Sequence, residues 1–467
     1  MTYNKPSSIL TPKIAVLCLP VMLLTGVGCG PEVASRPNTM IEHQITFNAK
    51  THALDNNDNF SPDGKYLCYD TRYMVFNTNL ANSKSIEKVE IASGKETVLW
   101  QPNSVSGENG APGVAAVSYH PSENKVIFIH GPQLEEVEER GYYDIRNRTG
   151  AMVSAGGDGY FSKVDMRDVA TERPTISGAQ RGGTHRHEFS RNGQRIGFTY
   201  DDFLQQEYDR TIGFMEADGD APDGYGYYFA VLLKPAKKGA SKPGEIEKAY
   251  GDSWVDSLGS KRAFIGKVRA QNGVDYESSL FIAEIPKDVD ITSAYAGDAD
   301  SYPEPPKGIK IKRLTHTTSD EGIVRGSYDG KRIAYLSKDD QGILQVYLIP
   351  VDGSDKDEDP KKRPVQVTNY SADAGFVRWH PTDDWLFSVS EGKIYAHDVG
   401  DSANLGNPIL LTMTDLKREA LVVSHDGRLL AYNVKIPNTE VSRMIDGKDD
   451  NEYYQIFILE LDDALRL

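Results

Sequence analysis

Hydrophobic and polar residues alternate along short stretches of this chain, and a sharp turn signal interrupts each stretch. In FSPDGKYLCYD, residues 60–70, the run from Lys65 to Tyr69 alternates with a period of two, which is the pattern of a half-buried β-strand. The preceding Pro-Asp-Gly favours a reverse turn, because glycine tolerates a positive φ and proline fixes its own φ. The stretch therefore predicts the end of one strand, a tight turn and a second strand.

The same strand-turn-strand unit recurs along the chain, once in a weaker form. Its seven copies lie at 60–70, 119–131, 189–202, 257–268 (the weak copy), 327–340, 379–392 and 423–434. A third strand follows, and then a short fourth strand that ends in threonine, as in IKRLTHT at 311–317. Four strands repeated at intervals of roughly 45 to 70 residues are the signature of a β-propeller. We therefore predict an all-β, seven-bladed β-propeller, with six blades as the alternative.

The two ends of the repeat region are expected to meet in one blade. The last unit stops after its third strand, QIFILELDD, at 455–463. The segment EHQITF, at 42–47, has the character of the fourth strands IKRLTH and PVQVTN. We therefore predict that 42–47 completes the last blade, which closes the ring and hides the strand edges that an open array would expose.

The residues before the repeats have a different composition. Lys5 and Lys13 precede the apolar run IAVLCLPVMLLTGV, which is short for a membrane span and typical of a secretory signal. Small residues then lead to Cys29, as in the lipobox of bacterial lipoproteins, although Gly26 stands where leucine is usual. In such proteins the cysteine is lipidated and becomes the new N-terminus.

These features predict three segments: a signal peptide at 1–28, a lipid-anchored tether at 29–42 and a propeller at 43–467. The expected location is the periplasmic side of the bacterial cell envelope, with the protein anchored in the membrane through Cys29. The alternative is a plain signal peptide, which would give a secreted or soluble periplasmic protein.

Charge and cysteine content narrow the possible partners. Asp and Glu outnumber Lys and Arg by 68 to 52, a formal net charge of −16, so nucleic acid is not an expected partner. Cys18 lies in the signal and Cys29 would carry lipid, which leaves Cys68 alone in the mature chain. An intramolecular disulfide is therefore not expected, and Cys68, in the middle of the strand KYLCYDT, is predicted to be a small core residue.

One short stretch suggests metal chemistry. In RGGTHRHEF, at 181–189, His185 and His187 are two positions apart, just before a repeat unit. Side chains at i and i+2 of a strand share a face, about 7 Å apart at Cα, so both imidazoles are candidates to hold one divalent ion such as Mn, Zn or Ca. The alternative is that both histidines are hydrogen-bonded parts of an ordinary strand.

Four further residues are candidates for substrate binding at the same rim of the ring. His52 and Arg72 bracket the first repeat unit, His130 follows a strand, and Arg181 precedes the histidine pair. The two arginines suit a carboxylate or sulfate group, which a guanidinium binds through two parallel hydrogen bonds.

Other polar residues are expected to be structural. His120 and His380 precede prolines at the position that Ser61 occupies in FSPDG, so we expect each to cap its turn. The acidic run at 352–360 is a possible calcium loop, but it lacks the regular ligand spacing and the glycine of such loops. We expect it to be a solvated loop.

The repeats resemble the TolB-type, WD40-like propeller repeat, and more closely the chain resembles the YidR-like family of uncharacterised bacterial proteins. The segments that carry this resemblance are QITF at 44–47, HALDNNDNFSPDGKYLCYDTR at 52–72, VIFIHGP at 126–132, YYDIRNRTG at 142–150, RGGTHRHEFSRNGQRIGFTYDD at 181–202 and AFIGKV at 263–268. The resemblance implies a propeller over nearly all of the mature chain. It implies no reaction.

A second, partial resemblance is to oligogalacturonate lyases, which are also propellers. There a histidine cluster holds a divalent metal that polarises a uronate carboxylate, while a base removes the α proton. HRH at 185–187 is similar to part of such a cluster. The remaining metal ligands and the base have no match in this sequence.

We therefore expect a binding or scaffold module at the cell envelope, whose partner is an envelope protein or an acidic or sulfated glycan. The alternative is a metal-dependent carbohydrate-active enzyme that works through the histidine pair. The sequence has no Gly-x-Ser-x-Gly elbow, no Cys-x-x-Cys zinc site and no P-loop, so those chemistries are not expected.

Overall fold

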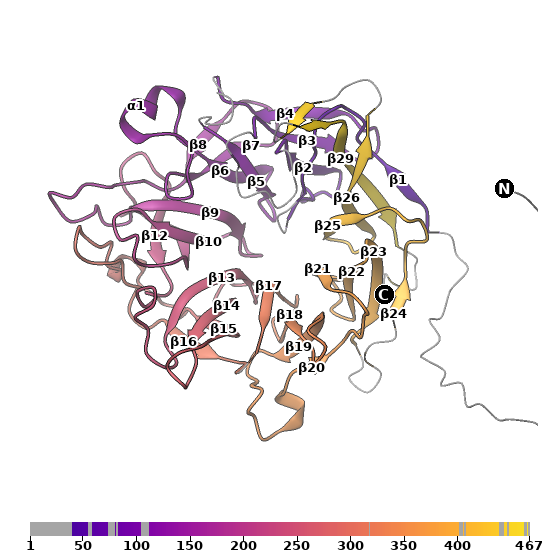
Figure 1. Ribbon diagram of the computed structural model, residues 1–467. Coiled ribbons are helices and arrows are strands. Elements are labelled where there is room, and N and C mark those ends of the chain that lie inside the picture. The colour runs from indigo at the N-terminus through magenta and orange to yellow at the C-terminus, as the bar shows by residue number, and fades with distance from the viewer. Residues whose placement is uncertain are drawn as a thin grey trace, which may run out of the picture.

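The computed structural model forms a ring of small sheets around a central axis (Figure 1). It describes residues 40–54, 58–72, 80, 83–103, 112–316, 318–400, 405, 408–438, 443–445, 448–461 and 465. The predicted signal peptide at 1–28 and most of the predicted tether, including Cys29, lie outside the described residues. In Figure 1 the chain passes once around the ring, from indigo to yellow.

Seven sheets form the blades in the described part of the chain, and each is antiparallel. Blade 1 contains β2 (Tyr66–Asp70), β3 (Ile86–Glu90) and β4 (Glu96–Trp100). Blade 2 contains β5 (Val114–Tyr119), β6 (Lys125–His130), β7 (Thr149–Ser154) and β8 (Phe161–Lys163). Blade 3 contains β9 (Gly182–Phe189), β10 (Arg195–Asp202), β11 (Thr211–Ala217) and β12 (Tyr227–Val231).

The later blades follow the same plan. Blade 4 contains β13 (Ile246–Trp254), β14 (Lys261–Arg269), β15 (Tyr276–Glu284) and β16 (Lys310–Arg313). Blade 5 contains β17 (Asp320–Gly326), β18 (Arg332–Lys338), β19 (Leu344–Pro350) and β20 (Val365–Gln366). Blade 6 contains β21 (Ala374–Trp379), β22 (Trp385–Ser390), β23 (Lys393–Asp398) and β24 (Pro408–Leu410). Blade 7 contains β25 (Arg418–Val423), β26 (Leu429–Pro437), β29 (Glu452–Glu460) and β1 (Glu42–Gln44).

Little else in the described residues is regular structure. A separate hairpin joins β27 (Arg443–Ile445) to β28 (Lys448–Asp450), and the helical elements are α1 (Val137–Arg140), η1 (Leu134–Glu136), η2 (Ile291–Ser293) and η3 (Pro360–Lys362). Within the described ranges, no helix has the length and apolar character needed to cross a membrane. The prediction of an all-β propeller with seven blades is confirmed, and the weak repeat at 257–268 is the turn and second strand of blade 4.

The turn of each repeat joins the first and second strands of a blade. In blade 1, Ser61 Oγ donates to Asp63 at 2.6 Å and accepts from the backbone of Tyr66 at 3.0 Å, while Gly64 has a φ of 68°. In the corresponding positions, His120 Nδ1 accepts from the backbone of Glu123 at 3.0 Å, and His380 Nδ1 accepts from that of Thr382 at 3.2 Å. Both histidines therefore cap their turns, as expected. We call the end of the ring that carries these turns the turn rim, and the opposite end the loop rim.

The ring is closed by strands from the two ends of the described chain. β1 pairs with β29, with Glu42 opposite Leu459 and Gln44 opposite Phe457 (Figure 1). The backbone of Ile45 extends the pairing by donating to Ile456 at 2.9 Å. The predicted closure by 42–47 is therefore confirmed. Because Leu459 lies near the turn between β25 and β26, β1 begins at the turn rim.

The hydrophobic core lies between neighbouring blades. One cluster joins Leu67 and Tyr69 of blade 1 to Val422 and Ile458 of blade 7, and comparable clusters fill the other interfaces. A blade is thus buried on both faces, so its second strand is buried on both sides. β10, for example, is buried at all eight positions. Each blade depends on its neighbours for the burial of its apolar surface.

The innermost strands of blades 2 to 7 each contain a β-bulge. The register with the second strand shifts in each blade, next to a residue with positive φ: Ala116 (56°), Arg186 (57°), Gly251 (64°), Gly322 (75°), Phe376 (53°) and Ala420 (54°). A bulge places extra residues on one strand opposite fewer on its partner. Side chains that follow the bulge therefore do not continue the simple alternation that precedes it.

Candidate functional site in the central channel

The histidine pair lies on β9 on either side of one of these bulges. His185 is opposite Thr199 on β10, and Glu188 is opposite Gly197. Thr199 and Gly197 are two residues apart and share a face of β10, so His185 and Glu188 also share a face. The expectation that His185 and His187 point the same way is therefore wrong, because the residue between them supplies the bulge.

Each imidazole contacts a different hydroxyl group. Thr199 Oγ1 contacts both ring nitrogens of the half-buried His185 and lies 3.0 Å from Nε2. His187 is fully buried, and its Nε2 lies 3.1 Å from Thr184 Oγ1. Burial lowers the pKa of His187 to about 3, and burial followed by nearby arginines lowers the pKa of His185 well below its usual range. Both rings are therefore neutral at pH 7.

The structure adds no third ligand to this pair. In the described part of the chain, no group of three or more His, Cys, Asp or Glu side chains is placed to hold a metal ion. The assignment of a divalent metal to His185 and His187 stays a prediction, and the shared face from which it was argued does not exist.

The two candidate arginines at the loop rim are engaged by carboxylates of the protein. Arg72 is buried and forms an ion pair with Asp70, with Nε 2.7 Å from Oδ1. Arg181 is also buried, and its Nη2 lies 2.8 Å from Asp202 while its Nη1 donates to the carbonyl of Ser301 at 2.9 Å. The contacts of Arg181 hold separate segments together, whereas the Arg72 ion pair is local. Their predicted use for substrate stays untested.

The two candidate histidines of the loop rim have local partners as well. His52 is buried between Glu96, 3.2 Å from its Nε2, and the carbonyl of Tyr454, 3.2 Å from its Nδ1. His130 Nδ1 lies 2.6 Å from the carbonyl of Gly131, and burial lowers its pKa to about 4. His52 thus links blade 1 to blade 7, whereas the contact of His130 lies within blade 2. The four predicted binding residues do not converge on one group.

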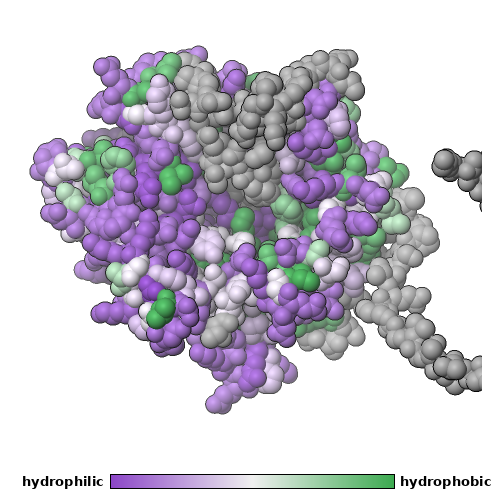
Figure 2. All heavy atoms as spheres, in the orientation of Figure 1, coloured by the Kyte–Doolittle hydropathy of each residue, from purple (hydrophilic) through white to green (hydrophobic). Residues whose placement is uncertain are grey.

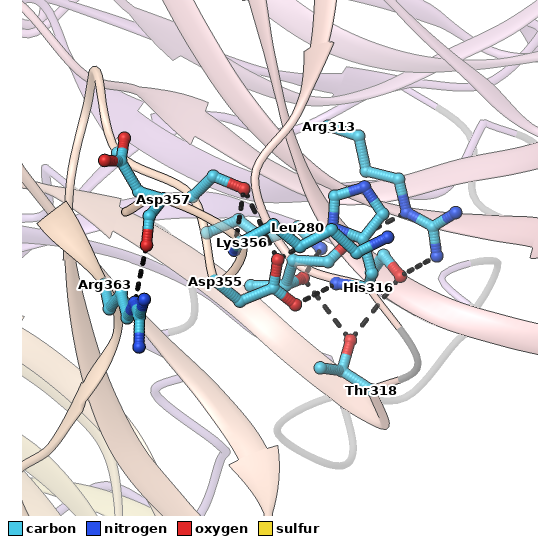
Figure 3. Close-up of polar contacts among 12 residues, drawn as sticks. Leu280, Arg313, His316, Thr318, Asp355, Lys356, Asp357 and Arg363 are labelled. Atoms are coloured by element: carbon cyan, nitrogen blue, oxygen red, sulfur yellow. Dashed lines mark hydrogen bonds and ion pairs between the residues drawn. The ribbon is translucent and has the colours of Figure 1, made fainter. Parts of the chain in front are cut away.

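The acidic run at 352–360 is folded against blade 4 (Figure 3). Asp355 accepts a hydrogen bond from the backbone of His316 at 2.6 Å and contacts the ring Nδ1 at 2.8 Å. Arg363 Nε donates to the carbonyl of Asp357 at 2.6 Å, and Lys362 pairs with Asp352 at 2.7 Å. The loop is therefore held by its own cations and by the histidine.

A cavity of about 310 Å³ opens at the turn rim, at the end of the channel remote from Arg72 and Arg181. We call it the channel mouth. Its lining residues come from the ends of the innermost strands and from the turns, and every blade contributes: Asp58, Pro121, Glu188, Ser253, Arg325, Arg378 and His425. The channel mouth is thus the point where all seven repeats converge on the axis.

Two arginines of adjacent blades enter the channel mouth with unsatisfied donors. Arg325 is 5% exposed, and its Nη1 lies 3.4 Å from the carbonyl of Val324. Its Nε and Nη2 have no hydrogen-bond partner among the described residues. Arg378 Nη1 donates to the carbonyl of Val377 at 2.9 Å, and its Nε likewise lacks a partner in the described part of the chain. Buried polar groups are nearly always hydrogen-bonded, so this pair needs an explanation.

The electrostatics of the channel mouth combine positive and negative groups. Burial, followed by the charges of Arg378 and Arg186, lowers the pKa of Arg325 well below its ordinary value, and burial lowers that of Arg378 to about 10. Burial raises the pKa of the Asp58 carboxyl, with His425 opposing. Burial alone would raise the pKa of Glu188, but neighbouring arginines, Arg262 first, hold it below its usual value.

Sequence reasoning missed Arg325 and Arg378, although a signal was present. Each is two positions before the residue that caps its turn, Ser327 or His380, and Glu188 has the same position in blade 3. Blades 1 and 2 have the neutral residues Asn59 and Ser118 there. Aligning the repeats on their turns would have shown charged residues at a position of the innermost strand. The predicted binding residues at the loop rim were instead chosen one by one, without such an alignment.

The chain is similar in sequence to a known protein family and to a known bacterial protein. A family model described as "Protein of unknown function (DUF3748)" matches residues 113–220. The chain is 32% identical over 423 residues to the uncharacterised protein YidR of Escherichia coli (strain K12), a match that covers 83% of this chain and 94% of YidR. The resemblance seen in the sequence is thereby confirmed.

Two solved propeller-type structures resemble this chain more distantly than YidR does. The β-propeller domain of the trilobed protease from Pyrococcus furiosus has a TM-score of 0.46 at 10% identity, covering 88% of this chain and 94% of that one. The putative TolB from Agrobacterium tumefaciens has a TM-score of 0.35 at 14% identity, covering 79% of this chain and 94% of that one.

Proposed function

The chain belongs to the YidR family, and from its geometry we propose that it is a binding module of the cell envelope whose ligand docks in the channel mouth. The observation that carries this proposal is the convergence of all seven blades on one polar cavity of about 310 Å³. A concave site with a few convergent polar groups is the usual form of a ligand pocket. The propeller supplies a rigid frame for these groups, because each strand end is fixed by its neighbours.

The chemistry of the channel mouth favours a glycan over a protein as ligand. It offers donors from arginine and acceptors from Asp58 and Glu188 side by side. Sugar hydroxyl groups both donate and accept hydrogen bonds, so they suit such a mixture. The face shown in Figure 2 is mostly hydrophilic, and its hydrophobic residues form small scattered groups outside the grey atoms. The described residues seen in this view form no broad apolar patch.

Binding is tested with the purified full-length protein and a panel of oligosaccharides. We expect isothermal titration calorimetry to show saturable binding of an oligogalacturonate or of a sulfated heparin-derived oligosaccharide, with no binding of a neutral malto-oligosaccharide. Hydrogen exchange with the bound glycan should protect 188–191, 325–328 and 378–380 at the turn rim, and leave 181–185 at the loop rim unchanged. Absence of binding by every glycan, cleavage of the bound glycan, or protection at the loop rim instead would overturn the proposal.

The envelope location rests on Cys29, which directly follows the predicted secretory signal. Acyl chains on this cysteine would anchor the protein, since each buried CH₂ contributes about 0.8 kcal/mol. In cell fractionation, the wild-type protein should sediment with membranes and Cys29→Ser should be released to the soluble fraction. Cys68→Ser serves as the matched control and should leave the distribution unchanged. Equal distributions for wild type and Cys29→Ser would remove the anchor from the proposal.

A further inference from the structure

Buried arginines elsewhere in this protein are matched by carboxylates. Arg262 lies 2.5 Å from Asp252 and 3.1 Å from Glu188, and Arg181 has Asp202 at 2.8 Å. Such pairing is expected, because a buried charge without a partner is strongly destabilising. Arg325, which is buried, and Arg378, which is half-buried, depart from this pattern. Among the described residues, their guanidinium groups contact backbone carbonyls of their own strands.

The side chains around the two arginines do not supply the missing carboxylate partners. Arg186 of blade 3 adds a third guanidinium, whose Nη1 donates to the carbonyl of Asp252 at 2.8 Å. Glu188 is shared with Arg262 and also accepts from Ser253 at 2.7 Å. Glu188 is therefore already engaged by the protein, whereas Arg325 Nε and Nη2 and Arg378 Nε have no hydrogen-bond partner among the described residues.

We propose that Arg325 and Arg378 form an oxyanion seat, which receives one carboxylate or sulfate group of the ligand. The planar guanidinium presents its N–H groups in a fork that matches two oxygens of such an anion. Arg325 and Arg378 lie on adjacent blades and line the same cavity, and the proposal places one anion between them. This inference rests on the proposed function only for the location of the ligand, and it specifies which chemical group that ligand must carry.

The neighbouring acceptors restrict the ligand further. Asp58 lines the same cavity, and Glu188 reaches it from blade 3. A group with several negative charges would meet these carboxylates, whereas hydroxyl groups next to a single anion would donate to them. The structure therefore fits a uronate or a sulfated sugar, with the anion on the arginines and the hydroxyls on the carboxylates.

The seat is tested by titrating small anions into full-length protein at constant ionic strength. The probes are inorganic sulfate, acetate, glucuronate and glucose 6-sulfate, with glucose as the neutral control. We expect saturable binding of the anions, and tighter binding of the two sugar anions than of sulfate or acetate. Arg325→Gln and Arg378→Gln should each weaken binding about ten- to hundredfold, and Arg378→Lys by less than Arg378→Gln, because lysine keeps the charge without the fork.

Arg428→Gln is the matched control. It removes one positive charge from the same rim, but its side chain is 68% exposed and forms no part of the channel mouth. Binding by this variant should stay within about twofold of wild type. Equal anion affinity in wild type, Arg325→Gln and Arg378→Gln would overturn the seat, and so would an equal loss in Arg428→Gln.

Thermal unfolding without added anion separates binding from structure. Because Arg325 has open donors beside other cations, Arg325→Gln should unfold at a temperature no lower than wild type. A marked fall in this temperature would show that the arginine holds the fold and would count against the seat. Sulfate also stabilises proteins by exclusion from their surface, so thermal shifts are compared between proteins at the same salt concentration.

The results also separate this inference from the proposed function. Arginine-dependent binding of sulfate without binding of any oligosaccharide would support the seat and count against the glycan proposal. Oligosaccharide binding that is equal in wild type, Arg325→Gln and Arg378→Gln would support the binding module and overturn the seat.

Discussion

The guanidinium of Arg418 and the carboxylate of Glu42 form two parallel hydrogen bonds across the closure of the ring. Arg418 Nε lies 2.6 Å from Oε1 and Nη2 lies 2.8 Å from Oε2, and the hydroxyl of Tyr432 donates to Oε1 at 2.6 Å. Arg418 belongs to the innermost strand of blade 7 and Glu42 to its outermost strand. The ion pair therefore reinforces the backbone pairing that holds β1 in place.

Removing the carboxylate from this pair should weaken the whole ring. In Glu42→Gln, the fully buried Arg418 loses its counterion, and breaking a buried pair costs roughly 3 kcal/mol. We expect the free energy of unfolding, measured with guanidinium chloride, to fall by about that amount. His43→Ala, on the next residue and with an exposed side chain, should change it by less than about 0.5 kcal/mol. Similar effects of the two substitutions would contradict the role given to Glu42.

The same pair sets a pH dependence. Burial would raise the pKa of Glu42, but hydrogen bonds from Arg418 and Tyr432 hold it below its usual value. A carboxyl with a lowered pKa in the folded state stabilises the protein above its unfolded pKa, and this contribution is lost as pH falls through the folded value. The stability difference between wild type and Glu42→Gln should therefore shrink between pH 6 and pH 3, as followed by denaturant titration.

Asp165 should act in the opposite direction. Burial raises its pKa to about 7, although Gly150 N at 2.6 Å and Thr184 Oγ1 at 2.9 Å both donate to it. Its contribution to stability is therefore complete below the unfolded pKa of about 4 and is lost as pH rises toward 7 and beyond. Asp165→Asn should flatten this decline, which has a slope of up to about 1.4 kcal/mol per pH unit.

Denaturant midpoints of wild type and Asp165→Asn between pH 5 and pH 8 provide the measurement. Asp320, whose pKa burial raises to about 6, is present in both proteins, so its contribution cancels in the difference. A pH profile that is identical in the two proteins would show that Asp165 does not titrate in this range.

The bulges of the innermost strands predict an unusual response to glycine. Ala420 and Ala431 are both buried in the same core cluster, but Ala420 has a φ of 54°. A side chain in this conformation costs about 1 kcal/mol that glycine avoids. Ala431→Gly should destabilise the protein by roughly 1 kcal/mol, whereas Ala420→Gly should be neutral or stabilising. Equal losses in chemical denaturation would mean that the positive φ carries no strain.

Cys68 should be inert in the folded protein. It is fully buried, Asn59 Nδ2 donates to its sulfur at 3.9 Å, and burial raises the pKa of the thiol well above its ordinary value. The thiolate is the reactive species, so both access and ionisation are suppressed. Iodoacetamide should leave the Cys68 peptide unmodified in native buffer and label it in guanidinium chloride, as read by mass spectrometry. Rapid native labelling would place this residue outside the core.

The histidine pair offers a test between two hypotheses. If His185 and His187 hold a divalent ion, then His185→Ala combined with His187→Ala should lose it. The hydrogen bonds to Thr199 and Thr184 instead predict a loss of stability, roughly 2–4 kcal/mol, from the cavity left by the buried ring of His187. Metal analysis and denaturant titration of both purified proteins distinguish these results, and we expect the metal content to be unchanged.

The blades and the closure of the ring were predictable because their signals are local. A turn such as the one at Ser61 to Gly64 needs particular residue types, and the alternation after it reports a strand. The bulges were not predictable, because four of the six positive-φ positions carry a side chain. The residue type of Arg186 does not reveal its positive φ. The predicted orientation of His187, on the same face as His185, was wrong for that reason. Arg325 and Arg378 could be recognised as site residues only from the structure, which brings the ends of seven strands together at one axis.

The start of β1 at the turn rim affects how the ring would be oriented relative to a membrane. Only eleven positions separate Cys29 from Met40, the first described residue, and an extended chain of that length reaches about 40 Å. With lipid on Cys29, this short tether would keep the turn rim, which carries Arg325 and Arg378, near the bilayer. Molecules in the open periplasm would then face the loop rim, and those reaching the two guanidiniums would have to come from the membrane surface itself.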